Sequence, residues 1–524
     1  MQVVDNTIYR LSLIAMRTFT ELPSELVVLI LTNLPAVDLV RCQQLSKYWY
    51  TLINNHAGLQ YSIALALTSM EDACATSFSS REKLDILNSF QRMWTSGSPF
   101  ESETIWPVVP YNDHMNLAQD TMVQGIGMRS LKFTRMSCDI TSASTISWDV
   151  ELDFDIVEFT FDPDEGLLIA IEARDNRCYV RLLDTNTGRG HKNATQDSLY
   201  IGEFGTPGQN DLMPLDGENL ILDTRSAEDM LVILANWEAE ERTMYRLTAW
   251  NWHEGTKFLE LSPSMDFLKD QYISSASPLN GRQIILGVTG GGQSDNQRGF
   301  AKVLDLTLGR SAYMEAVTLE FPPLTASLED LSIWRNVPAT PSRRSLHHNY
   351  LPFQCTQDDA IISFGLLLDP PNGHDLPGEY HFVIPTSKFI RCVERAAKCS
   401  GCCLPWAEWL PDNCRLFSVD GAWDVAGSRG IRQSGGHIEI MNFAEAAVRR
   451  HETSPNNDYL TLVNTPVEVN APVFWKCPIT TSLPYLMHSV PLPDETQFEA
   501  VYCGSDTIFL CNENNTMVLR PKYW

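Results

Sequence analysis

The sequence predicts an α+β multidomain protein, with a short helical region followed by a much larger, predominantly β domain. Two observations carry this prediction. Residues 22–53 hold closely spaced aliphatic side chains interrupted by prolines, whereas after about residue 100 short strand-like runs recur between turns. The predicted division is a tail at 1–18, a helical domain at 19–55, a helical connector at 56–100 and a β-rich domain at 101–524.

The first expected helix has too many apolar residues for one face. Pro23 can open it, and Pro35 ends it, because the residue before proline is pushed out of helical geometry. One stripe is formed by Val27, Ile30, Leu31 and Leu34, while Leu26 and Leu29 point elsewhere. Three short helices cannot bury both apolar faces of this helix themselves. We therefore expect a partner chain to cover the second face.

This run closely resembles the fungal-type F-box. The matching elements, in order, are Leu22-Pro23, Leu29 to Leu31, Leu34-Pro35, Asp38-Leu39-Val40, and Lys47 with Trp49. Ser46 departs from the pattern, since many members carry Cys there. The resemblance implies docking to a Skp-type adaptor and, through it, to a cullin-based ubiquitin ligase. The adaptor-binding residues that it implies are Leu22, Pro23, Leu26, Ile30, Leu34, Pro35, Leu39, Leu45 and Trp49.

The connector contains one clear helical pattern. Leu84, Leu87 and Trp94 fall on one side of it, Ser79 or Ser80 can cap it, and Glu82 or Lys83 lies in the first turn. The cluster Ser96-Gly97-Ser98-Pro99 then indicates a boundary. A stiff connector of this kind would suit a protein that positions one partner relative to another.

The β-rich domain contains a degenerate repeat. Residues 159–170 read as strand, acidic turn and strand, and lead into 180–188, which ends in Asp184 and Gly188. Together these resemble a WD-like β-propeller blade, with Leu183 at the place of the signature tryptophan; weaker echoes lie at 246–255, 302–309 and 439–443. We expect a six- or seven-bladed β-propeller, with a pair of β-sandwiches as the alternative.

A propeller closes when its terminal segments pair in one blade. The chain ends in three strand-like runs, Glu499–Cys503, Thr507–Cys511 and Thr516–Leu519. We therefore expect them to pair with strands within residues 129–152. The main helical exception in this domain is expected at Phe443–Arg450.

Charge limits the choice of partner. The net charge is −26, and residues 1–100 hold 7 Lys and Arg against 8 Asp and Glu, so almost all the excess lies in the β-rich domain. Such a surface repels phosphate backbones, which argues against nucleic acid. It suits a protein with a basic or neutral contact segment, or serves only solubility.

Nothing in the sequence predicts a membrane protein or a secreted one. No apolar run reaches the length of a membrane span, and no targeting segment stands out. The 13 cysteines are irregularly spaced, as is typical of reduced thiols inside the cell. We expect the cytoplasm, the nucleus or both.

No motif nominates a cofactor or a metal. Cys399 and Cys402 have zinc-ligand spacing, and Cys392 and Cys403 lie near them, but no second pair accompanies them, so free thiols are favoured. The acidic segment 162–166 is expected to be a hairpin turn rather than a calcium loop, and the glycine-rich 287–294 a plain loop. His347-His348 is expected in a solvated loop.

The sequence thus favours a substrate-recognition subunit of a Skp-cullin-F-box ubiquitin ligase, with no catalysis and no cofactor of its own. The protein substrate would bind the β-rich domain. Two rivals remain: a propeller scaffold without a degradative role, and a propeller enzyme with its site in the central channel. No catalytic motif such as G-x-S-x-G or H-E-x-x-H is present.

Overall fold

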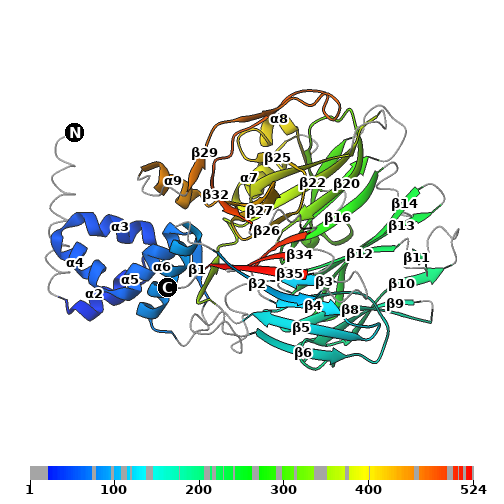
Figure 1. Cartoon of the computed structure of the whole chain (residues 1–524), viewed down its shortest axis with the longest axis horizontal. Helices are drawn as coiled ribbons and strands as arrows, with labels where there is room; N and C mark the ends of the chain where they lie inside the picture. Colours follow the sequence, from blue (N-terminus) through cyan, green and yellow to red (C-terminus); the bar gives the residue numbers. More distant parts are fainter. Residues whose placement is uncertain are drawn as a thin grey trace.

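A computed structural model gives the arrangement of the chain. It describes residues 22–73, 78–95, 100–107, 115–118, 121–136, 145–175, 177–205, 213–214, 220–227, 229–239, 242–262, 271–290, 298–311, 316–335, 351–371, 377–399, 402–453, 460–492, 498, 500–504, 507–511 and 515–521. Helices near the N-terminus lie beside a large β-rich body (Figure 1).

The N-terminal helices form the first part of the structure. They are α2 (Ser24–Leu31), α3 (Ala36–Leu45), α4 (Lys47–Asn55), α5 (Ala57–Leu67) and α6 (Ser80–Thr95). The first four share one small core, made by Val27, Leu31, Leu39, Trp49, Ile53, Leu59 and Ile63. The expected boundary at residue 55 therefore falls just before a helix, α5, that contributes two residues to this core.

Sheets of four or five strands make up the β-rich body, and seven of them occur in the described part of the chain. The first three are β3 (Met115–Ala118), β4 (Thr121–Gly125), β5 (Ser130–Met136) and β6 (Thr145–Glu151); β7 (Ile156–Asp162), β8 (Leu167–Arg174), β9 (Arg177–Asp184), β10 (Ser198–Gly205) and β11 (Met213–Pro214); and β12 (Leu220–Ala227), β13 (Met230–Ala239), β14 (Arg242–Asn251) and β15 (Thr256–Leu261).

The next three sheets follow in chain order. They are β16 (Gln271–Asn280), β17 (Gln283–Gly290), β18 (Gly299–Asp305), β19 (Val317–Glu320) and β24 (Cys403–Leu404); β20 (Ser327–Trp334), β22 (Ile361–Asp369), β23 (Gly378–Pro385) and β25 (Arg415–Val419); and β26 (Trp423–Ala426), β27 (Arg429–Ser434), β28 (His437–Asn442), β32 (Tyr485–Pro491) and β29 (Thr461–Val463). Two short pairs add β1 (Met70–Asp72) with β21 (Phe353–Cys355), and β30 (Val467–Val469) with β31 (Ile479–Thr481).

The seventh sheet joins the two ends of the domain. Its order is β2 (Phe100–Pro107), β35 (Asn515–Pro521), β34 (Ile508–Cys511) and β33 (Ala500–Cys503). Figure 1 shows blue β2 beside red β35, and Phe100 pairs with Pro521. The expected closure through a blade of mixed origin is present, but the expected partner segment, 129–152, is wrong. That segment forms strands of the neighbouring sheet, β3 to β6.

Apolar clusters between successive sheets hold the propeller together. Each of six clusters contains buried residues from two neighbouring sheets; in one, Ile169 of β8 packs with Ile233 of β13. Burying one such side chain contributes about 1.5–3 kcal/mol. The α+β architecture and the propeller are therefore as the sequence predicts, and the alternative of two sandwiches is wrong.

The acidic turns of the repeat work as predicted. Asp162 Oδ1 accepts hydrogen bonds from the backbone N–H of Asp164 at 2.9 Å and of Glu165 at 3.2 Å, and Gly166 follows at φ +67°. A residue with positive φ closes the turn, and glycine adopts this geometry without a steric penalty. The same device recurs after β9, where Asp184 Oδ1 accepts from two backbone N–H groups.

Helices inserted into the β-rich body are α7 (Thr386–Ala396), α8 (Trp406–Trp409), α9 (Glu445–Thr453) and the 3-10 helix η3 (Leu306–Ser311). The expected helix at 443–450 corresponds to α9. In contrast, α7 is missing from the sequence prediction, although Phe389, Cys392, Val393 and Ala396 give it one buried face.

Candidate adaptor-docking surface and its junction with the propeller

Helix α2 is covered on one side only. Its Val27 and Leu31 are buried in the core of the four helices, with 0% and 2% of their surface exposed. In contrast, 48% of Leu26, 62% of Leu29 and 42% of Ile30 is exposed. The helix starts after Pro23, whose carbonyl oxygen accepts from the Leu26 N–H at 3.0 Å. The sequence prediction of a helix that needs a second cover therefore matches the geometry.

Exposed apolar side chains gather in this part of the protein. Of the 16 exposed large hydrophobic residues among those described, eight lie between residues 22 and 50. Besides Leu22 and the three on α2, they are Val37, Leu45, Tyr48 and Tyr50. A soluble protein rarely concentrates such side chains without a partner for them. The distribution thus points to an interface on the first helices.

The sequence-predicted contact residues fall into two groups. Leu22, Pro23, Leu26, Ile30, Pro35 and Leu45 are exposed, and Leu34 is half-buried. Leu39 and Trp49, by contrast, lie in the core of the helices, with 0% and 8% exposed. These two side chains shape the surface by packing beneath it rather than by lying on it. The contact of all nine with an adaptor stays a prediction.

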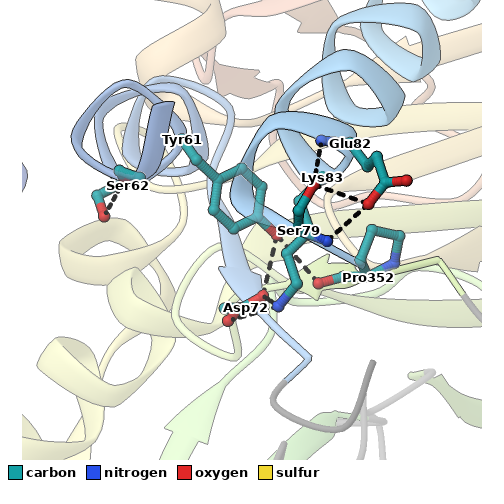
Figure 2. A network of polar contacts seen from close by, with 8 residues as sticks. Tyr61, Ser62, Asp72, Ser79, Glu82, Lys83 and Pro352 are labelled. Atoms are coloured by element: carbon teal, nitrogen blue, oxygen red, sulfur yellow. Dashed lines mark hydrogen bonds and ion pairs between the residues drawn. The ribbon is translucent and has the colours of Figure 1, made fainter. Parts of the chain in front are cut away.

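Polar contacts join the last helices to the propeller. Tyr61 Oη on α5 lies 3.0 Å from the carbonyl oxygen of Pro352 and 3.0 Å from Asp72 Oδ1. Lys83 of α6 donates to both oxygens of Asp72, at 2.8 and 3.1 Å (Figure 2). Strand β1, which carries Asp72, pairs with β21. The Tyr61–Pro352 bond and the pairing of β1 with β21 therefore join the connector to residues 352–355, and Lys83 holds β1 to α6 within the connector.

The start of α6 carries the predicted cap. Ser79 N–H donates to Glu82 Oε2 at 2.7 Å, and the Glu82 N–H points back to Ser79 Oγ at 3.4 Å (Figure 2). This reciprocal pair is a capping box. Hydrogen bonds from the Ser79 side chain and backbone lower the pKa of Glu82, so the carboxylate stays charged at the helix start.

An apolar core continues the junction. Leu87, Phe90 and Trp94 of α6 belong to the same buried cluster as Phe353 and Ile440 of the propeller. The Phe90 and Phe353 rings meet edge to face, with centroids 5.2 Å apart. Aromatic and aliphatic burial of this kind makes the connector part of the propeller's own packing.

A second candidate site lies on the propeller. A cavity of about 450 Å³ is lined by Glu165, Asn193, Asp229, Asn251, His253 and Glu254, which come from turns of two neighbouring sheets. His253 Nε2 lies 3.2 Å from Asp229 Oδ1. Three carboxyl groups around one hollow favour a cationic segment of a partner. This cavity could not be read from the sequence, because its residues lie far apart along the chain.

One constellation looks catalytic but is structural. Ser363 Oγ lies 2.9 Å from His381 Nδ1, and His381 Nε2 lies 2.8 Å from Glu379 Oε1. Ser363 and His381 are fully buried between β22 and β23, so no substrate reaches the hydroxyl. A nucleophile needs access to its substrate as well as a base. The three residues instead satisfy buried polar groups.

The cysteine cluster is not assembled into a metal site by the described residues. Cys392 is buried, Cys399 is exposed, and Cys403 Sγ lies 3.6 Å from Glu320 Oε1. Within the described ranges no group of three or more His, Cys, Asp or Glu side chains could hold a metal ion. His347-His348 and residues 291–294 lie outside the described residues. No helix among those described has the length and apolar character of a membrane span.

Comparison with known proteins identifies the helical region. Residues 19–64 match the family model described as F-box-like, so the chain carries an F-box-like domain followed by the propeller. This domain implies the role of a substrate-receptor adaptor, which is generally not catalytic. No curated protein sequence matches the chain.

Two solved structures resemble the chain at low identity. One is the polysaccharide lyase Uly1, with 9% identity, a TM-score of 0.39 and coverage of 79% of this chain and 90% of that one. The other is the WD40 domain of SCAP from fission yeast, with 8% identity, a TM-score of 0.29 and coverage of 81% and 95%. Neither likeness indicates an activity for this protein.

Proposed function

From the F-box-like domain at residues 19–64, we propose that this protein is the substrate-recognition subunit of a Skp-cullin-F-box type ubiquitin ligase. The F-box-like domain binds a Skp-type adaptor and, through it, a cullin. The propeller binds a protein substrate, and the complex acts in the cytoplasm, the nucleus or both. The protein itself does no covalent chemistry.

The observation that carries this proposal is the one-sided cover of α2. Leu26, Leu29 and Ile30 are exposed on a helix whose opposite side is fully packed. The proposed adaptor contacts are these side chains together with Leu22, Pro23, Leu34, Pro35 and Leu45. Fully burying a large aliphatic side chain is worth about 1.5–3 kcal/mol, and each of these half-exposed side chains would contribute part of that on binding.

The junction supports the same role. A receptor acts by raising the effective concentration of a substrate lysine near the ubiquitin-charged enzyme, and this depends on a connection of fixed geometry. Here Tyr61 bonds to the carbonyl oxygen of Pro352, strand β1 of the connector pairs with β21, and Phe90 packs against Phe353. A long flexible linker would dilute the effect.

The acidic cavity supports a basic contact segment in the substrate. Glu165, Asp229 and Glu254 line it, in a domain that holds nearly all of the negative charge. Charge complementarity of this type speeds association and weakens in salt. Glu165→Gln with Glu254→Gln is therefore expected to lower the affinity for the substrate and to reduce its salt dependence.

The test of the function is affinity purification with the full chain as bait. A Skp-type adaptor and a cullin should co-purify, and a substrate should be recovered in larger amounts with an Ile30→Asp variant, because capture no longer leads to degradation. Recovery of stable partners without adaptor or cullin would favour the alternative, a propeller scaffold without a degradative role. Turnover of a substrate by the purified chain alone would favour the other alternative, a propeller enzyme.

A further inference from the structure

A cavity of about 320 Å³ lies where the F-box-bearing helices meet the propeller. One wall is formed by Phe90, Gln91 and Trp94 of α6. The other walls come from α9, from strands β27, β28 and β32 of one propeller sheet, and from Thr68 and Met70 at the end of α5 and the start of β1. The volume is in the range of small-molecule sites in proteins.

The lining of this junction cavity is basic. It includes two arginines, Arg429 and Arg450, and two histidines, His451 and His488, while no Asp or Glu belongs to it among the described residues. The chain as a whole carries a net charge of −26. The ionisable side chains that the structure describes around the junction cavity are all basic, so the local charge there is opposite in sign to that of the whole chain. Such a reversal favours an anion.

Contacts with aromatic rings and with a backbone carbonyl oxygen orient the two arginines. The Arg429 guanidinium lies 4.0 Å from the ring centroid of Trp94 and 5.3 Å from that of Phe90. Arg450 donates from Nη2 to the carbonyl oxygen of Leu67, at the end of α5, at 3.2 Å. A ring face and a carbonyl oxygen orient a guanidinium but leave it positive. Both groups are thus pre-positioned around the cavity.

Phe90, Trp94, Ile440 and Leu486 give the lining a buried apolar part, and Thr68, Gln91, Ser428 and Asn442 add uncharged polar side chains. An apolar wall with a few convergent charged groups is typical of a site for an organic ligand. We propose that the junction cavity binds a small organic anion, in which a carboxylate or phosphate head meets the arginines and an apolar or aromatic body packs against α6. This site is separate from adaptor and substrate binding.

A ligand in this position would bridge two parts of the protein. It would contact α6, which leads from the F-box-like domain, and α9, which belongs to the propeller. A ligand that binds only the assembled junction stabilises it by mass action. The bound anion would therefore strengthen the connection that orients the F-box-like domain.

The test is a titration of the full chain with phenyl phosphate and with phenylacetate, followed by calorimetry and by thermal unfolding. At least one should bind with a stoichiometry of one and raise Tm, and the tighter of the two identifies the head group as phosphate or carboxylate. Inorganic phosphate supplies only the anionic head, and benzyl alcohol only the aromatic body. Each should bind about tenfold or more weakly than the organic anions. Hydrogen exchange should slow in α6 and α9.

Matched variants on one helix locate the site. Arg450→Gln should weaken binding about tenfold or more, because a charge-assisted contact is lost. Arg449→Gln is the control, since Arg449 is exposed and pairs with Glu445 outside the cavity; His488→Gln is a second variant in the lining. The inference fails if neither probe binds, if Arg449→Gln and Arg450→Gln act alike, or if inorganic phosphate binds as tightly as the organic anions.

Discussion

Tyr61 Oη lies 3.0 Å from the carbonyl oxygen of Pro352, a residue 291 positions further along the chain. Tyr61 is buried on α5, which also packs into the core of the F-box-like domain through Leu59 and Ile63. One helix therefore serves both the helical domain and the propeller. The domain is attached through packed structure rather than through a free linker.

Tyr61→Phe should destabilise the protein by about 0.5–1.5 kcal/mol, because the one hydroxyl that contacts the Pro352 carbonyl oxygen and the Asp72 carboxylate is lost while the ring stays in place. The measurement is chemical denaturation of the full chain. Tyr48→Phe is the control, since Tyr48 is 39% exposed on α4. Equal stability of the two variants would show that the Tyr61 contact contributes nothing to the junction.

Asp424→Asn should remove part of the pH dependence of stability. Burial raises the pKa of Asp424 from its ordinary 3.8 to about 7, although the Cys503 N–H, at 2.7 Å, opposes the shift. The folded protein then holds a proton that the unfolded chain releases, so stability falls as the pH rises from about 4 to about 7. The effect is on the order of a few kcal/mol.

The comparison that isolates this group is denaturation of both proteins at several pH values. The stability of Asp424→Asn relative to the parent should increase as the pH rises from 4 to 7 and then become constant. A difference that does not change with pH would mean that Asp424 is ionised in the folded state across this range.

Truncation after Thr496 should destabilise the whole propeller cooperatively. It removes β33, β34 and β35. Strand β2 then loses its pairing with β35, in which Phe100 lies opposite Pro521 and Pro107 opposite Asn515. It also strips Val501, Ile508 and Leu510 from a cluster shared with the neighbouring sheet and α6. Thermal unfolding would report this as a large fall in Tm; an unchanged transition would rule out a closed ring.

The sequence alone reveals the local features of this fold. The first helix can be predicted because Pro23 and Pro35 mark its limits. The acidic turns can be predicted because Asp162 and Asp184 accept hydrogen bonds from residues two or three positions later. Such signals lie within one short segment. The apolar excess on α2 is also local, so the exposed apolar surface of this helix could be predicted.

Features that depend on distant residues could not be predicted. The pairing of β2 with β35 joins the two ends of the domain, and nothing in either strand specifies the partner. Leu39 belongs to the F-box-like pattern, yet only the packing of the four helices shows that it is buried. Likewise, the junction cavity unites α6 with α9, whose residues are separated by most of the propeller.

The central claim, that the F-box-like domain docks a Skp-type adaptor through α2, is tested most directly by the affinity of the purified adaptor for matched surface variants. Leu22→Ala with Pro23→Ala and Ile30→Asp should abolish binding while the propeller unfolds at the parental temperature. The control is Leu308→Asp, because Leu308 is 41% exposed and Ile30 42%; it should bind as the parent does. Unchanged adaptor affinity in the triple variant would contradict the account.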